Sequence, residues 1–179
     1  YEVSGIRKAA EGAGGSVEIM APFKFVETAI PQGRSIHSWP VYRDIVDADL
    51  VINVPIAKSH GLTTLTLGGK NLMGVITDPS GLHEDHDQRI ADLVSLVRPA
   101  LTVVDAFRIL TRNGPTGGDL EDVKQTRQVI ASHDLVAADS FAATLFDLTA
   151  ADVPFIVAAA RRDLGQADLR RLRIEEISI

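Results

Sequence analysis

The sequence predicts an α/β fold, a three-layer sandwich in which a mainly parallel central sheet carries helices on both faces. Two nearly continuous apolar runs of strand length, at residues 50–54 and 101–107, are typical of parallel strands that are covered on both sides. Segments with helical spacing separate the predicted strands. Strands that alternate with helices favour parallel pairing through right-handed crossovers.

The first elements are a helix over residues 3–10, where apolar residues recur at helical spacing, and a β-like run at 17–20. Glycines at positions 12, 14 and 15 end that helix. Two further extended pieces are expected at 24–30 and 35–36, separated by a Pro-Gln-Gly turn signal.

A short helix over 41–46 is predicted after Pro40, because proline suits a first helical position. The strand over 50–54 follows it. We expect Pro55 to close this strand, since proline cannot donate a hydrogen bond to a ladder.

The clearest helix spans 84–98, where apolar residues follow the i, i+3, i+4, i+7 pattern and acidic residues come early. A buried strand over 101–107, a loop at 114–118 and a strand over 127–131 come next. The remaining predicted elements are a helix from Ser132 or Asp134 to Leu148, a helix over 153–164 and an edge strand over 173–179.

Length and composition indicate one domain over residues 1–179, with 45% hydrophobic and 23% charged residues. A net charge of -6 argues against a nucleic-acid surface. The chain has no cysteine, so it cannot itself ligate an iron–sulfur cluster. No apolar stretch reaches the roughly 18–20 residues of a membrane span. The chain does not begin with methionine, so we expect a missing upstream segment; the compartment stays open, with the cytoplasm favoured.

The candidate site starts with Lys58-Ser59-His60, which follows the predicted strand over 50–54. Ligands bind beyond the carboxyl ends of parallel strands, so we expect Lys58, His60 and Asp105 to share one edge as catalytic residues, with His60 as general acid or base. Lys70 and Asn71 are predicted to bind the ligand, since a helix start there offers free N–H groups to an anion. Singly, each residue also suits an ordinary solvated or turn role.

Three further positions extend this hypothesis. Asp139 lies on the apolar side of its predicted helix and needs a partner, which Lys58 or Lys70 would supply. Its role is therefore either that of a structural counter-ion or that of a group that tunes a lysine. Gly117 and Gly118 would bind ligand through backbone N–H groups, although glycines also mark ordinary turns.

A divalent metal is a further candidate ligand. His83 and His86 are three residues apart and share a helix face if that segment is helical, and His60 would join them as a metal ligand. The alternative is a solvated acidic helix start that the helix dipole favours.

Six motifs in this order resemble one family: Ile52-Asn53-Val54-Pro55, Lys58-Ser59-His60-Gly61-Leu62, Lys70-Asn71-Leu72-Met73-Gly74, Val103-Val104-Asp105, Gly114-Pro115-Thr116-Gly117-Gly118 and Asp134-Leu135-Val136-Ala137-Ala138-Asp139. From about Ser4 onward the chain resembles domain-of-unknown-function family 362. Members often carry ferredoxin-type iron–sulfur modules, so the resemblance implies a redox setting and an iron–sulfur redox partner. Ser59 stands where the family usually has threonine, and Leu135 where proline is common. The family's usual upstream segment is missing here.

Together these observations lead us to expect a redox-associated enzyme domain that binds an anionic small molecule or a metal-bearing cofactor at the carboxyl ends of the strands. The alternative is a non-catalytic module that docks an electron-transfer or maturation partner, which would show an exposed apolar patch. A third reading makes the polar residues a structural network between loops and sheet. Whether the chain is an enzyme stays open.

Overall fold

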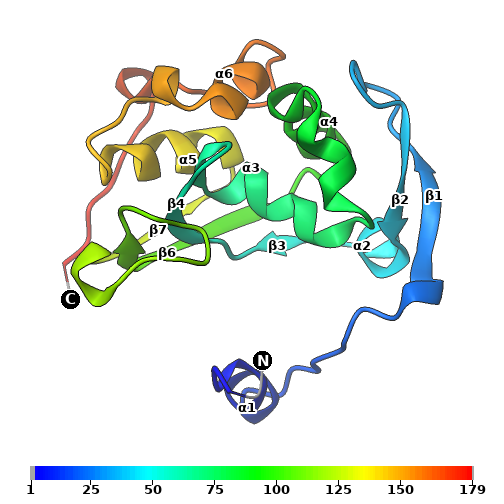
Figure 1. Cartoon of the computed structure of the whole chain (residues 1–179), viewed down its shortest axis with the longest axis horizontal. Coiled ribbons are helices and arrows are strands. Elements are labelled where there is room, and N and C mark those ends of the chain that lie inside the picture. Colours follow the sequence, from blue (N-terminus) through cyan, green and yellow to red (C-terminus); the bar gives the residue numbers. More distant parts are fainter. Residues whose placement is uncertain (1–2, 179) are drawn as a thin grey trace.

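The computed structural model describes residues 3–178, apart from the side chains of Leu82 and His83 (Figure 1). The strands are β1 (Phe25–Ala29), β2 (Ser38–Tyr42), β3 (Ile52–Asn53), β4 (Ile56–His60), β5 (Thr64–Thr66), β6 (Leu101–Leu110) and β7 (Val123–Ser132). The α-helices are α1 (Ile6–Gly12), α2 (Arg43–Asp47), α3 (Gly68–Asn71), α4 (His86–Val97), α5 (Leu135–Thr144) and α6 (Pro154–Ala160). Short 3₁₀ helices are η1 (Pro22–Lys24), η2 (Leu72–Val75), η3 (Pro79–His83), η4 (Leu120–Asp122), η5 (Ala150–Asp152) and η6 (Leu169–Arg171).

The central sheet is built around β6, which pairs with three other strands. Both β3 and β4 run parallel to β6, one after the other along the same edge. The outer strands are antiparallel, β5 to β4 and β7 to β6. A separate antiparallel ribbon of β1 and β2 stands at one end of the sheet (Figure 1). The predicted α/β class is confirmed, and its central ladders are parallel as expected.

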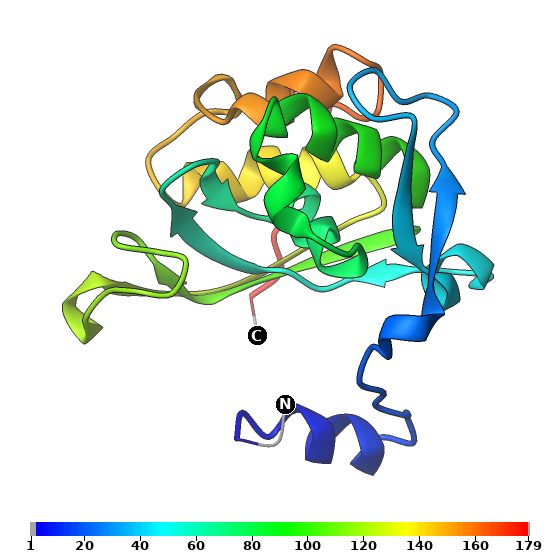
Figure 2. The same cartoon turned by 45° about the vertical axis from the view of Figure 1, so that its right-hand side comes forward.

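Helices α3, α4, α5 and α6 cover one face of the sheet, and α1 lies on the other side (Figures 1 and 2). This arrangement agrees with the predicted three-layer sandwich. Alternation along β6 assigns the two faces: Thr102, Val104 and Ala106 are buried beneath the helices, whereas Asp105 and Phe107 are exposed.

The strand predicted to end at Pro55 continues beyond it. The backbone N–H of Asp105 donates to the carbonyl of Pro55 at 2.8 Å. Proline lacks only the donor, so its acceptor keeps the parallel ladder together until β4 begins at Ile56. As a result Lys58 and His60 lie within a strand, and the expectation that they follow one was wrong.

Some other local predictions were also wrong. Residues 17–20, 35–36 and 172–178 form no strand in the part of the chain that the structure describes. The alternating pattern at these places finds no neighbouring strand to pair with, and pairing with neighbours is what stabilises a strand. The helices predicted over 84–98, 134–148 and 153–164 appear as α4, α5 and α6 with shorter ends.

A buried carboxylate joins three separate segments of the helical layer. Asp92 of α4 accepts hydrogen bonds from the backbone N–H groups of Arg34, Ser35 and Ile36, each at 2.9 Å. Its Oδ1 also forms a salt bridge with Arg162, at 2.6 Å, after α6. These contacts attach the segment between β1 and β2 to the helices.

Within residues 3–178, every helix is too short or too polar to cross a membrane.

Candidate functional site

The site centres on α3, whose first turn is held by a buried carboxylate. Asp139 of α5 accepts hydrogen bonds from the N–H groups of Gly68 at 2.7 Å and Gly69 at 2.8 Å. A side chain at Gly68 would meet the Asp139 carboxylate at 2.7 Å, so glycine is needed for this approach. Asp139 therefore contacts the start of α3, and the expected lysine partner is replaced by backbone donors that helix starts leave unpaired.

Two asparagines connect the same helix to the sheet. Asn53 at the end of β3 is buried, and its Nδ2 donates to the carbonyl of Gly68 at 2.9 Å. The Nδ2 of Asn71 donates in turn to Oδ1 of Asn53 at 2.8 Å. Sequence reasoning assigned no role to Asn53, although a polar residue inside the apolar run 50–54 was a usable signal. The pair fixes Asn71 at the exposed end of α3.

Lys58 of β4 and Lys70 of α3 are half-buried and lie within electrostatic range of each other. Burial lowers the pKa of Lys58. Burial also lowers the pKa of Lys70, and the charge of Lys58 lowers it further. Neither ammonium forms a salt bridge with a carboxylate of residues 3–178, so two partly desolvated positive charges stand together.

Thr66 is a further residue of this site that sequence reasoning missed. It lies directly opposite Lys58 in the β4–β5 ladder. Its side chain is 8% exposed, and its hydroxyl has no hydrogen-bond partner among the described residues. A buried, unpaired hydroxyl costs stability unless something else satisfies it. The signal was absent from the sequence, because only the register of β5 places Thr66 beside Lys58.

His60 and His86 approach each other through a small cavity next to Lys70. The residues that line it are His60, Leu62, Thr63, Lys70, Met73 and His86. Nδ1 of His60 accepts from the N–H groups of Leu62 at 3.1 Å and Thr63 at 3.3 Å. A neutral imidazole that accepts at Nδ1 carries its proton on Nε2, so His60 presents an N–H donor at its far side.

The geometry does not assemble the expected metal ligands. With its proton on Nε2 and its Nδ1 used as an acceptor, His60 has no nitrogen lone pair left for a metal. Nε2 of His86 lies 3.0 Å from the carbonyl of Leu62. The side chain of His83 lies outside the described residues. Among those that are described, no three His, Asp or Glu side chains come together as a metal site.

Asp105 does not join the lysines. Its neighbours Val104 and Ala106 are fully buried under the helices, so Asp105 faces the opposite side of the sheet from α3. There its Oδ1 accepts from the N–H of Phe107 at 3.0 Å. The expected shared edge therefore holds Lys58, His60, Lys70 and Asn71 but not Asp105.

The loop between β6 and β7 lies against the strand that carries Lys58. The N–H of Gly114 donates to the Ser59 hydroxyl at 3.0 Å. Gly117 and Gly118 are exposed, and Gly118 has a φ of 95°, which favours glycine. They flank the site, although a role in turn formation explains Gly118 equally well.

Comparison with known proteins places this geometry in a family context. The family model described as Domain of unknown function (DUF362) matches residues 1–144. The chain is 29% identical over 132 residues to the thylakoid-associated protein sll1697 of Synechocystis sp., an alignment that covers 69% of this chain and 40% of that protein. The chain thus spans about two fifths of the length of this curated relative. No solved structure matches the chain significantly.

Proposed function

The chain belongs to the family Domain of unknown function (DUF362), and from this premise we propose that it binds a small anionic ligand between Lys58 and Lys70. The observation that carries the proposal is the pair of half-buried lysines without a carboxylate partner among the described residues. An anion placed between them relieves both the desolvation of each ammonium and their mutual repulsion.

The charge of the pair favours a dianion such as a phosphate group. One negative charge leaves one lysine unneutralised, whereas two negative charges balance both. The Thr66 hydroxyl supplies a further donor to the ligand, and in doing so gains the partner that it lacks in the protein. Three donors from β4, β5 and α3 then surround the anion.

Two neighbouring residues have supporting roles in this proposal. His60 presents its Nε2–H toward the ligand and is the candidate general acid. Asn71, fixed by Asn53, orients the ligand by hydrogen bonding. Asp105 has no part in the site, because it faces away from α3.

A redox-associated enzyme is the finer form of the proposal. It rests on the resemblance to a family whose members often carry iron–sulfur modules, and the reaction is left open. A metal-bearing cofactor fits only through an anionic group that contacts the lysines, since the described residues hold no cluster of metal-ligating side chains.

The competing hypothesis, a module that docks a protein partner, has one observation in its favour. It requires an exposed apolar patch, and the sheet face opposite the helices exposes large apolar residues.

Titration with inorganic phosphate tests the anion site, with chemical shifts of backbone amides and calorimetric heat as readouts. We expect shifts at Thr66, Lys70 and Asn71. Lys58→Met and Lys70→Met should each weaken binding about tenfold or more, because each removes a charged hydrogen bond.

Lys124→Gln is the matched control, since Lys124 is an exposed lysine of β7 and should leave binding unchanged. Succinate, a dicarboxylate, distinguishes a requirement for two charges from a requirement for tetrahedral geometry. The proposal fails if phosphate binds the wild type no better than it binds the double variant of Lys58 and Lys70.

A further inference from the structure

The face of the sheet turned away from α3 to α6, here called the outer face, is built like a protein interior. Five of its large apolar side chains are between 47% and 66% exposed: Ile52, Val54, Ile56, Phe107 and Val129. The ladder registers place Ile56 beside Asp105 and Asp105 beside Val129, so the face is continuous across three strands. Parallel ladders are normally covered on both faces, and this one lacks its second cover.

The helix α1 has the complementary deficiency. It comprises seven residues, and none of them is buried. Ile6, Ala9 and Ala10 recur at helical spacing and form one apolar side, on which Ile6 remains 49% exposed. Isolated helices shorter than about 12 residues are marginal in water, so α1 needs a surface to pack against.

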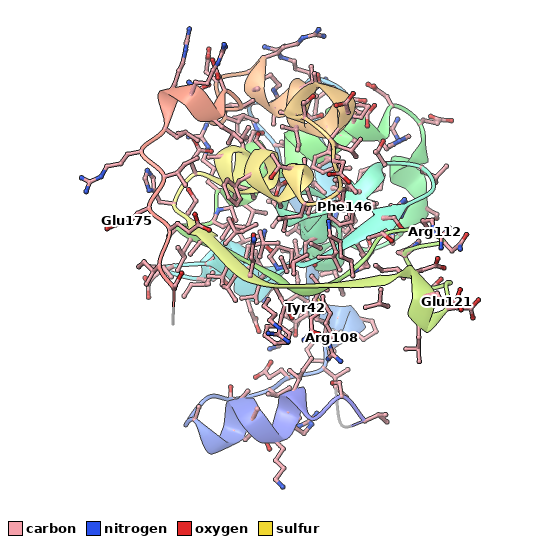
Figure 3. All side chains as sticks on the ribbon, turned by 90° about the vertical axis from the view of Figure 1, so that its left-hand side faces the viewer. Tyr42, Arg108, Arg112, Glu121, Phe146 and Glu175 are labelled. Atoms are coloured by element: carbon pink, nitrogen blue, oxygen red, sulfur yellow. The ribbon has the colours of Figure 1, made fainter. Side chains whose placement is uncertain are left out.

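Position and tether bring these two surfaces together. Figure 3 shows α1 on the side of the sheet away from the other helices, which is the side of the outer face. Residues 13–21 between α1 and η1 form neither helix nor strand, and Gly14 has a φ of 87°. An extended segment spans about 3.3 Å per residue, so this linker allows α1 to move by more than the thickness of a protein layer.

Charge fits the same contact. Arg7 lies beside the apolar side of α1, one helical position from Ile6. Asp105 lies in the middle of the outer face, between Ile56 and Val129. A helix that lays Ile6, Ala9 and Ala10 on this face brings opposite charges of Arg7 and Asp105 together.

We propose that α1 docks on the outer face of the same chain and supplies part of the second helical layer. Ile6 packs against Ile56 and Val129, and the linker over residues 13–21 acts as the hinge. The outer face is then an intramolecular docking surface for α1 that also excludes other occupants while α1 is bound.

Disulfide trapping tests the contact directly, because the chain has no cysteine of its own. Ala9→Cys is combined with Val129→Cys on the outer face and incubated with oxidised glutathione, which forms the protein disulfide by thiol exchange. We expect an intramolecular bond, seen as a monomer of altered mobility on a non-reducing gel and as the mass lost with two thiol hydrogens.

Ala9→Cys combined with Ala151→Cys is the control, since Ala151 is exposed in η5 on the helical side. This pair should form the bond at least tenfold more slowly. Adding Ile6→Asp to the first pair should slow trapping to the control rate, because a charge then faces apolar side chains.

Three outcomes overturn the proposal. A disulfide-linked dimer as the main product identifies a second copy of the chain as the occupant. Equal rates for the two cysteine pairs show that α1 samples all surfaces alike. Unchanged trapping after Ile6→Asp shows that apolar packing does not drive the contact.

Discussion

At the level of single residues, the buried polar groups around α3 divide into those that are satisfied within the fold and one that is not. Asp139 accepts from two N–H groups, and Asn53 both donates and accepts. Thr66 is equally buried, but its hydroxyl has no partner among the described residues. Groups of the first kind hold α3 in place, whereas Thr66 is available to a ligand.

Substitution of Thr66 separates stability from binding. Thr66→Val replaces the unpaired hydroxyl with a methyl group of similar size, so the free energy of unfolding should rise by about 1 kcal/mol. The same change should weaken phosphate binding, because the ligand loses one donor. Urea denaturation and phosphate calorimetry measure the two effects.

Thr63→Val is the matched control for this change. Thr63 is buried in the same segment, but its hydroxyl donates to the carbonyl of Leu65 at 3.0 Å. Its replacement should therefore lower stability by about 1 kcal/mol. A loss of stability in both variants would contradict the assignment of Thr66 as an unsatisfied group.

Asp139 should make stability depend on pH. Burial raises the pKa of Asp139 from 3.8 to about 7, against the opposing effect of the Gly69 and Gly68 N–H groups. The folded state then holds a proton that the unfolded state releases, so this contribution is complete at low pH and is lost as the pH rises to about 7. In that window the slope approaches about 1.4 kcal/mol per pH unit.

Asp139→Asn should remove this slope, as measured by urea denaturation at several pH values through the window. Asp147→Asn is the control, because Asp147 is exposed and its φ of 60° suits asparagine. If the wild type and Asp139→Asn show parallel stability curves, Asp139 is ionised throughout the window and the argument is wrong.

At the level of elements, short connections and backbone acceptors decide how strands pair. The parallel β4 continues past Pro55 because the proline carbonyl still accepts from Asp105. β7 follows β6 through a loop too short for a crossover helix, so it pairs antiparallel. In the helical layer, Asp92 joins α4 to the segment between β1 and β2 and to Arg162.

Removal of Asp92 should therefore be more costly than removal of its charged partner. Asp92→Ala leaves three backbone N–H groups and the nearly buried Arg162 without their acceptor, at a cost of about 3–5 kcal/mol. Arg162→Met should cost less, because Asp92 keeps its three N–H donors. Urea denaturation of both variants checks the order, and equal losses would contradict it.

At the level of the whole molecule, one continuous core connects the β1–β2 ribbon with the helical layer. The buried cluster includes Ile36 and Val41 near the ribbon and Phe155 and Ile156 in α6, and Trp39 packs against it. Nε1 of Trp39 donates to the carbonyl of Thr77 at 2.8 Å. The ribbon and the sheet should therefore unfold as one cooperative unit.

Trp39 is the single tryptophan and reports on the ribbon, whereas circular dichroism reports on all helices and strands. The two probes should give coincident urea transitions in the wild type. Val41→Ala, which opens a cavity in the shared core, should shift both midpoints equally. An earlier transition for Trp39 would show that the ribbon unfolds separately.

The sequence by itself determined the α/β class, the main helices and the residues that carry charge near α3. These follow from local periodicity, and Lys58, His60, Lys70 and Asn71 are close enough along the chain to meet through β4, β5 and α3. It also identified Asp139 as a buried carboxylate, because its position on the apolar side of a helix is a local property.

Only the tertiary structure decided which groups face one another. It turned Asp105 to the outer face, placed Thr66 opposite Lys58, and gave Asp139 the N–H groups of Gly68 and Gly69 as partners. Strand register and the packing of distant segments set these contacts, and a shift of one residue in register reverses every side chain of a strand. No pattern within one segment of sequence contains that information.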